Sequence, residues 1–127
     1  MLRTADGEPC ATAIFASHDR FRRPDIARLR PGEWVLVELV TWPEQAGRGL
    51  GTLMVQHSSR AMFDLGATRL ISFMWWSHAA SLRVFLKAGW QRTRFSAALG
   101  DPAQPWLTLR LPPMLAPRTR GMRKLAR

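Results

Sequence analysis

The pattern of apolar and polar positions along the chain predicts short strands at its N-terminal end. Two extended runs, Leu2–Thr4 and Pro9–Ser17, flank Ala5–Glu8, whose Asp-Gly pair is typical of a β-hairpin turn. The run Trp34–Thr41 is apolar on both faces apart from Glu38, as expected of a strand inside a sheet. We therefore expect a hairpin followed by an interior strand.

The arginine-rich segment 18–32 connects these strands. It contains Pro24 and Pro31, which interrupt regular structure, and it leaves room for one helical turn over Asp25–Leu29. We expect the rest of this segment to be irregular.

A helix is predicted after the glycine-rich segment 47–51, because mostly apolar positions recur at steps of three and four residues. The β-branched and aromatic run Thr68–Trp76 predicts a second interior strand. Strand, helix and strand in succession indicate a right-handed crossover between parallel strands. The helical positions are Leu50, Leu53, Met54, His57, Ala61, Met62 and Leu65, and Gly66 stands where helices commonly end.

The C-terminal part of the chain predicts one more helix and one more pair of strands. Ser77 stands where it would cap the helical segment Ala79–Ala88, and Gly89 ends that segment. Gln91–Leu99 and Trp106–Leu111 flank a turn that contains glycine and proline, so we expect them to pair antiparallel. The order of elements predicts an α/β protein of the α+β type with a mixed sheet.

Composition narrows the class of protein. The 127 residues are 46% hydrophobic, with no apolar run near bilayer length and no secretory signal, so we expect a soluble cytoplasmic protein without a membrane partner. The one cysteine, Cys10, cannot form an internal disulfide, which fits a reducing compartment. We expect a single domain over residues 1–112 and a basic, flexible tail over 113–127.

The formal net charge of +10 is concentrated in two clusters. Such clusters attract polyanions, including nucleic acid and coenzyme phosphates, or they form a solvated surface. We favour the solvated surface, because aromatic residues are not interleaved with these charges as single-strand binding requires. One cluster is Arg20, Arg22, Arg23, Arg28 and Arg30; the other is Arg118, Arg120, Arg123, Lys124 and Arg127.

The stretch Trp42–Met54, WPEQAGRGLGTLM, joins the interior strand to the helix and carries glycines at 47, 49 and 51. Glycines let the backbone approach a ligand closely, and the first N–H groups of a helix point outward with the positive end of its dipole. The stretch therefore predicts a phosphate site. The dinucleotide-binding turn has another glycine spacing, and the nucleoside-triphosphate loop has a lysine that is absent here.

This stretch resembles the pyrophosphate-binding motif P-E-x-x-G-x-G-x-G of the GNAT superfamily of acyl-coenzyme A-dependent N-acyltransferases. The segment Ser77–Trp90, SHAASLRVFLKAGW, resembles the second signature of the family, with His78 in place of the usual asparagine and Phe85 in place of the usual tyrosine. The resemblance covers Pro9–Leu111. It implies the GNAT fold, a mostly antiparallel central sheet in which the central parallel strands splay around a β-α-β coenzyme A-binding core.

The resemblance also implies acetyl-coenzyme A as the acyl donor, without a metal. The pantetheine arm would pair with the strand backbone, and N–H groups of the glycine stretch would hold the pyrophosphate. Arg48 adds charge there, whereas Ala46 replaces a usual basic or glutamine residue. The implied coenzyme-binding residues are Leu39, Val40, Thr41, Ala46, Gly47, Arg48, Gly49, Leu50, Gly51, Thr52, His78, Ser81 and Phe85.

Direct attack by an amine on the thioester needs a base, and the leaving thiolate benefits from an acid. Glu38 is the only acidic residue within the interior strand, and we nominate it as the base or as the group that positions the amine. The alternative is a structural, edge-facing or salt-bridged glutamate. Because the chain has no tyrosine, His78 or water would serve as the acid.

The acceptor implied by analogy with the family is a primary amine of a small molecule. The family normally has more structure before the first long strand, so the chain resembles a form shortened at the N-terminus, and a homodimer would supply a missing wall. Two alternatives stay open. The chain is a catalytically silent coenzyme A-binding module, or it is a module that interacts with nucleic acid.

Overall fold

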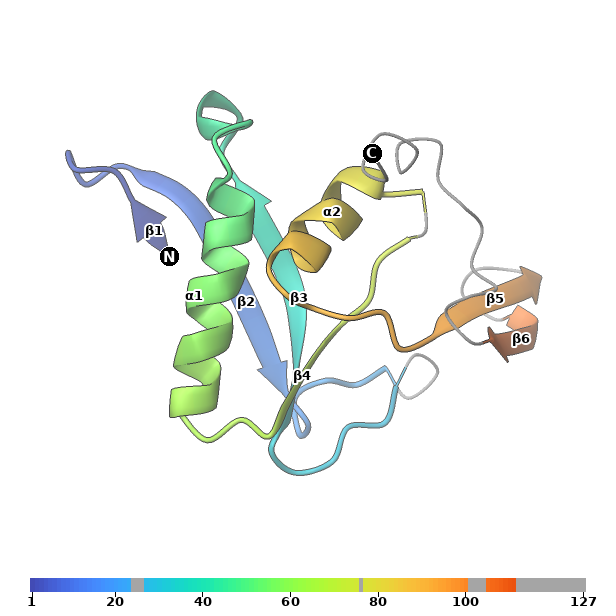
Figure 1. Ribbon diagram of the computed structural model, residues 1–127. Coiled ribbons are helices and arrows are strands. Elements are labelled where there is room, and N and C mark those ends of the chain that lie inside the picture. The colour runs from blue at the N-terminus through green and yellow to red at the C-terminus, as the bar shows by residue number, and fades with distance from the viewer. Residues whose placement is uncertain (24–26, 76, 101–104, 112–127) are drawn as a thin grey trace.

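The computed structural model describes residues 1–23, 27–75, 77–100 and 105–111, and for 95–100 and 105–111 it describes the backbone only. Three strands come first, helices and single strands alternate after them, and a pair of strands ends the described chain (Figure 1). In order they are β1 (Leu2–Arg3), β2 (Pro9–Ser17), β3 (Glu33–Thr41), the 3-10 helix η1 (Pro43–Gln45), α1 (Leu50–Asp64), β4 (Arg69–Ser72), α2 (Ala79–Lys87), β5 (Phe95–Gly100) and β6 (Pro105–Leu111).

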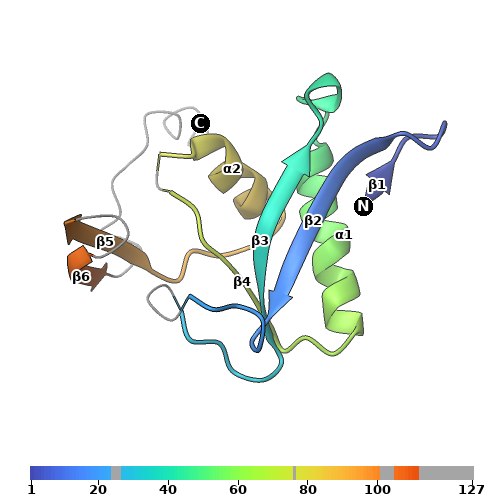
Figure 2. The ribbon, with the colours of Figure 1, turned by 180° about the vertical axis from the view of Figure 1, so that it is seen from behind.

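The main sheet has the strand order β1-β2-β3-β4. The pairs β1–β2 and β2–β3 are antiparallel, and β3–β4 is parallel, so α1 forms the crossover of a β-α-β unit. Figures 1 and 2 show α1 and α2 on one face of this sheet, and no described helix covers the other face. The core lies under the helices, where Leu36, Val55 and Phe85 form a buried cluster.

Much of the predicted architecture is confirmed. The N-terminal hairpin forms as β1 and β2, β3 is interior between β2 and β4, and the crossover strands are parallel. Helix α1 forms where predicted, and Gly66, with φ of +95°, follows its end. Its predicted apolar face is only partly correct: Met54 is buried, but Leu53, His57, Ala61 and Leu65 are exposed, and Val55, outside that face, is buried instead. No helix in the described part of the chain has both the length and the apolar character needed to span a membrane.

The prediction for the run Thr68–Trp76 is wrong in the length of the strand and in its place within the sheet. The strand expected over Thr68–Trp76 ends at Ser72, and β4 lies at the edge of the described main sheet. β5 and β6 pair antiparallel as expected but form a separate two-stranded sheet. The composition of the run favours extended structure, but a strand also needs a partner, and β4 loses its partner where β3 diverges from it.

The predicted cap of α2 is also wrong. His78 occupies the N-cap position, and no described side chain makes a capping hydrogen bond there, so Ser77 does not cap the helix. Of the helical turn expected over Asp25–Leu29, the described Ala27–Leu29 belong to no helix, although the Ala27 N–H donates to the Arg23 carbonyl at 3.0 Å. Trp76, the turn at 101–104 and the predicted tail lie outside the described residues.

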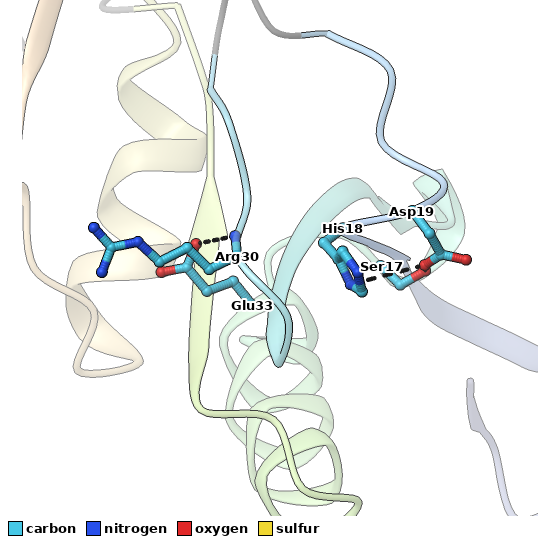
Figure 3. Close-up of polar contacts among 5 residues, drawn as sticks. All are labelled: Ser17, His18, Asp19, Arg30 and Glu33. Carbon is cyan, nitrogen blue, oxygen red and sulfur yellow. Dashed lines mark hydrogen bonds and ion pairs between the residues drawn. The ribbon is translucent and has the colours of Figure 1, made fainter.

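A buried carboxylate fixes the start of β3 beside the start of β4. Glu33 accepts a hydrogen bond from the Arg30 N–H at 2.8 Å, and the Arg69 guanidinium lies 3.4 Å from its other oxygen. These interactions, the backbone bond foremost, hold the pKa of Glu33 below its ordinary value of 4.5. Figure 3 shows the Arg30–Glu33 bond, and beside it the hydrogen bond that Ser17 donates to Asp19 after β2.

Candidate functional site

The chain after β3 turns sharply into α1. Gly47 and Gly49 adopt the left-handed backbone conformation, with φ of +78° and +76°, and Gly49 is the N-cap of the helix. Apart from the glycine itself and the residues next to it in the chain, no described atom would lie within 4 Å of a Cβ added at either position. Their conformational freedom, and not a lack of space, therefore explains why glycine stands there. The two residues redirect the chain from the end of the sheet into the helix.

The first backbone N–H groups of α1 have no acceptor within the helix. The Leu53 N–H donates to the Gly49 carbonyl at 3.1 Å, so the N–H groups of Leu50–Thr52 precede the helical ladder. No described side chain caps them. The exposed Arg48 lies beside them and donates to the side-chain oxygen of Gln45. Together with the positive end of the helix dipole, these groups form a site that favours an anion.

Gly51 has a different role from the other two glycines. Its φ is not positive, and a Cβ at this position would lie 3.5 Å from Thr41 Oγ1 and 3.6 Å from the Val84 methyl groups. These are ordinary van der Waals distances, so an alanine fits at this position and a longer side chain would press on the end of β3 and on α2. Gly51 is a packing residue at which the first turn of α1 lies close to both elements.

Strands β3 and β4 pair for only part of their course. Their register ends at Leu36 and Ser72, where the Ser72 hydroxyl donates to the Leu36 carbonyl at 3.2 Å. On the other side of β3, Phe15 lies opposite Leu36 and Ile14 lies opposite Glu38, which leaves Val37 as an extra residue. This is a β-bulge, and a bulge bends the strand that carries it. The two strands diverge from this point.

A cleft of about 190 Å³ opens where the strands diverge. It lies between the second half of β3 and the chain that leads from β4 to α2, and α2 forms one wall (Figure 1). Seven of its ten lining residues have apolar side chains, and the other three contribute hydroxyl or imidazole groups. The lining residues are Leu36, Val37, Leu39, Ser72, Phe73, Met74, Trp75, His78, Ser81 and Phe85.

One edge of β3 is unpaired beside this cleft. β2 pairs with the backbone of Leu39–Thr41 on one side, whereas the pairing of β4 on the other side stops at Leu36. In the described chain no strand covers that second edge beyond Leu36. An unpaired edge presents N–H and C=O groups that an extended ligand can bind as an additional strand.

The inner wall of the cleft is held rigidly. Phe85 is 5% exposed and packs edge-to-face against Trp90, with ring centroids 5.0 Å apart. The Trp90 indole N–H donates to Ser59 Oγ at 3.1 Å, and the Ser59 hydroxyl donates to the Val55 carbonyl at 2.6 Å. This chain of contacts fixes α2 against α1, so that His78 and Ser81 face the cleft from a rigid support.

The sequence profile of the acetyltransferase (GNAT) family matches residues 2–90. The chain belongs to the GNAT acetyltransferase family. No curated protein matches it. The fold is similar to that of a solved structure named "Putative acetyltransferase from Agrobacterium tumefaciens str. C58", with a TM-score of 0.58 and 20% identity over 77% of this chain and 65% of that one. That similarity supports the GNAT fold, and the chain spans less than two thirds of that protein.

The structure brings most of the predicted site residues of this GNAT chain to one end of β3. Leu39, His78, Ser81 and Phe85 line the cleft, and Ala46–Thr52 form the loop and first turn beyond it. Val40 and Thr41 continue β3 from the cleft to the loop. Their coenzyme contacts remain predictions.

Glu38 does not line the cleft, although it belongs to the same stretch of β3. Leu39 packs against the buried core, and neighbouring residues of a strand point to opposite faces. Glu38 is exposed and therefore points to the face that no described helix covers. Its role in catalysis remains a prediction.

Sequence reasoning missed several residues of this GNAT cleft. Ser72 fastens the two strands where they part, Val37 forms the bulge, and Phe73 and Met74 follow the end of β4. The uniformly apolar run of β3 hides the bulge, and no local signal marks the end of β4. Among the described residues no group of three or more His, Cys, Asp or Glu side chains is placed to hold a metal ion.

Proposed function

We propose that the chain transfers an acetyl group from acetyl-coenzyme A to a primary amine of a small molecule. The observation that carries this proposal is the divergence of β3 and β4 beyond Leu36 and Ser72. It opens a cleft beside an unpaired strand edge, and the same strand leads into the anion-favouring first turn of α1. A ligand with an extended, amide-bearing arm and a pyrophosphate matches this sequence of features.

In the proposed complex the pantetheine arm pairs with the free edge of β3 over Val37–Thr41. The pyrophosphate binds the N–H groups of Gly49–Thr52, with Arg48 adding charge at the rim. The thioester then lies in the cleft between β3 and the residues after β4. Main-chain donors supply most of this binding, which fits a site where Ala46 offers no phosphate-facing side chain.

The proposed reaction is direct attack of the neutral amine on the thioester carbonyl carbon. A C–N bond forms, the C–S bond breaks, the amine loses a proton and the coenzyme thiolate gains one. His78 and Ser81 are cleft residues whose side chains can donate a proton or hydrogen bond to the leaving thiolate. Glu38, on the opposite face of β3, is the proposed base or positioning group for the amine.

Release of free coenzyme A thiol in the presence of a panel of primary amines tests this proposal. We expect amine-dependent release, at least about tenfold lower in His78→Ala than in the control His57→Ala, since general acid catalysis contributes about a hundredfold or more where it operates. His57 is an exposed histidine of α1 outside the cleft. Binding of acetyl-coenzyme A without release by any amine would favour the silent module instead.

A further inference from the structure

Three large apolar side chains that line the cleft are open to solvent. Val37 is 49% exposed, Phe73 is 44% exposed and Trp75 is 69% exposed. They lie on both sides of the gap, Val37 on β3 and the aromatic residues on the chain after β4. Exposed aromatic residues at the mouth of a cleft are typical of a binding surface.

These side chains point away from the buried core under the helices. Met74 packs against that core, whereas its neighbours Phe73 and Trp75, on the irregular chain after β4, are exposed and point toward the opposite face. Glu38 points to that face for the same reason. Figure 2 shows this face, on which no described helix lies. The cleft therefore has a helical wall that carries His78 and Ser81 and an aromatic mouth that opens on the opposite face.

A loop from another part of the chain supports this aromatic mouth. The ring of Phe21, from the connection between β2 and β3, stacks on Phe73 with centroids 6.2 Å apart and an interplanar angle of 12°. Stacking between two segments so distant in sequence restricts the Phe73 ring and leaves part of it exposed. A restricted aromatic surface loses little freedom when a flat group binds to it.

We propose that the acceptor is a primary amine that carries a flat apolar group, an arylalkyl amine. Its ring lies against Trp75 and Phe73, and its nitrogen lies near Glu38 at the gap between the strands. This inference rests on the proposed function. The ammonium nitrogen first loses a proton to a base and then attacks the thioester carbonyl as the neutral amine. The C–N bond forms, the C–S bond breaks, the nitrogen loses a second proton and the thiolate gains one, which yields an acetylated amine, free coenzyme A and one released proton.

The charge and the shape of an arylalkyl amine both match this part of the cleft. An amine reaches the site largely as its ammonium ion, which an exposed carboxylate and the face of a tryptophan both attract. A flat ring gains contact with stacked aromatic side chains that a flexible or puckered apolar group does not. A polyamine would interact with Glu38 but would gain little from the aromatic side chains. A second copy of the chain would cover the aromatic side chains without any amine being bound.

Matched amines test the inference. We compare kcat/KM for phenethylamine, cyclohexylethylamine and spermidine at saturating acetyl-coenzyme A. We expect the aryl amine to be used best, and we expect Trp75→Ala and Phe73→Ala to raise its KM about tenfold, the effect of one lost aromatic contact. Because Trp75 and Phe73 line the cleft that also takes the thioester, each variant is measured at an acetyl-coenzyme A concentration that saturates that variant. Phe63→Ala, at a 51% exposed position on α1 outside the cleft, is the control and should match the parent protein.

The outcomes separate this inference from the proposed function. Turnover with spermidine or cyclohexylethylamine at least equal to that with phenethylamine overturns the aryl acceptor and leaves acetyl transfer standing. A dimer that Trp75→Ala dissociates, without any preference among the amines, also overturns it and assigns the surface to a second copy. If no amine is acetylated although the coenzyme binds, both proposals fail.

Discussion

Alanine substitutions at Gly49 and Gly7 test whether the loop Ala46–Thr52 binds the pyrophosphate. The two glycines have the same left-handed backbone conformation but stand in different loops. Gly49, the N-cap of α1, has φ of +76°, and Gly7, in the hairpin turn between β1 and β2, has φ of +85°. Apart from the glycine itself and the residues next to it in the chain, no described atom lies within 4 Å of a Cβ built at either position. Alanine therefore introduces left-handed strain and no clash at both, a cost of about 1–2 kcal/mol. Each variant should melt about 3–8 °C lower than the parent protein.

The two substitutions should differ in their effect on the affinity for acetyl-coenzyme A. At Gly49 the added methyl group stands on the loop where the pyrophosphate must approach the helix N-terminus, and we expect at least about a tenfold loss of affinity, roughly 1.4 kcal/mol. Gly7→Ala should bind acetyl-coenzyme A like the parent protein. Isothermal titration below the melting transition measures both. A thioester that lacks the pyrophosphate should bind the two variants equally.

Equal affinity of Gly49→Ala and Gly7→Ala for acetyl-coenzyme A would refute the assignment of this loop. The strain cost is common to both, so a stability effect alone cannot separate them. Only a ligand that contacts the loop around Gly49 makes the two proteins differ.

Three further predictions concern residues that hold the strands and helices around the site in place. At Gly51 alanine should leave the melting temperature nearly unchanged, whereas leucine should lower it, since space beyond a Cβ is limited by Thr41 and Val84. Glu33→Gln should destabilise the protein at pH 7 by about 1–3 kcal/mol, because it replaces a carboxylate that accepts a charge-assisted hydrogen bond. Since the pKa of Glu33 is lowered on folding, this stability is present above pH 4.5 and is lost as pH falls through the folded-state pKa. Trp90→Phe should cost about 0.5–1.5 kcal/mol in urea unfolding, through the lost hydrogen bond to Ser59.

Each of these predictions has a result that contradicts it. A leucine at Gly51 that melts with the parent protein would show that α1 and α2 do not meet there as described. A stability difference for Glu33→Gln that persists at pH values where the folded-state carboxyl is protonated would mean that the charge of the carboxylate is not the cause. Unchanged urea stability of Trp90→Phe would remove the indole hydrogen bond from the support of the cleft.

The local pattern of the sequence predicted the parts of the site that depend on local chemistry. The glycines of Gly47–Gly51 act within a few residues, through backbone conformation and the helix start. The existence of helix α1 likewise follows from a helical period, although its buried face, which includes Val55, does not. These features were therefore available from residue types and spacing alone.

The cleft depends on contacts between distant segments, and the sequence did not predict its bounds. The end of β4 is set by the hydrogen bond from Ser72 to Leu36 and by the bulge at Val37, which arises in pairing with β2. The run after Ser72 is rich in aromatic residues and looks like a continuing strand. Phe73 and Trp75 of this run instead line the mouth of the cleft, which is why the strand prediction ran too far.

Backbone amide chemical shifts recorded during a titration with coenzyme A test the central claim most directly. The claim is that the free edge of β3 and the first turn of α1 hold the same ligand. The account predicts that the amides of Val37–Thr41 and Ala46–Thr52 shift together at one dissociation constant. No shift, or shifts confined to another surface such as the outer hollow along Gln56–Arg60 of α1, would contradict it.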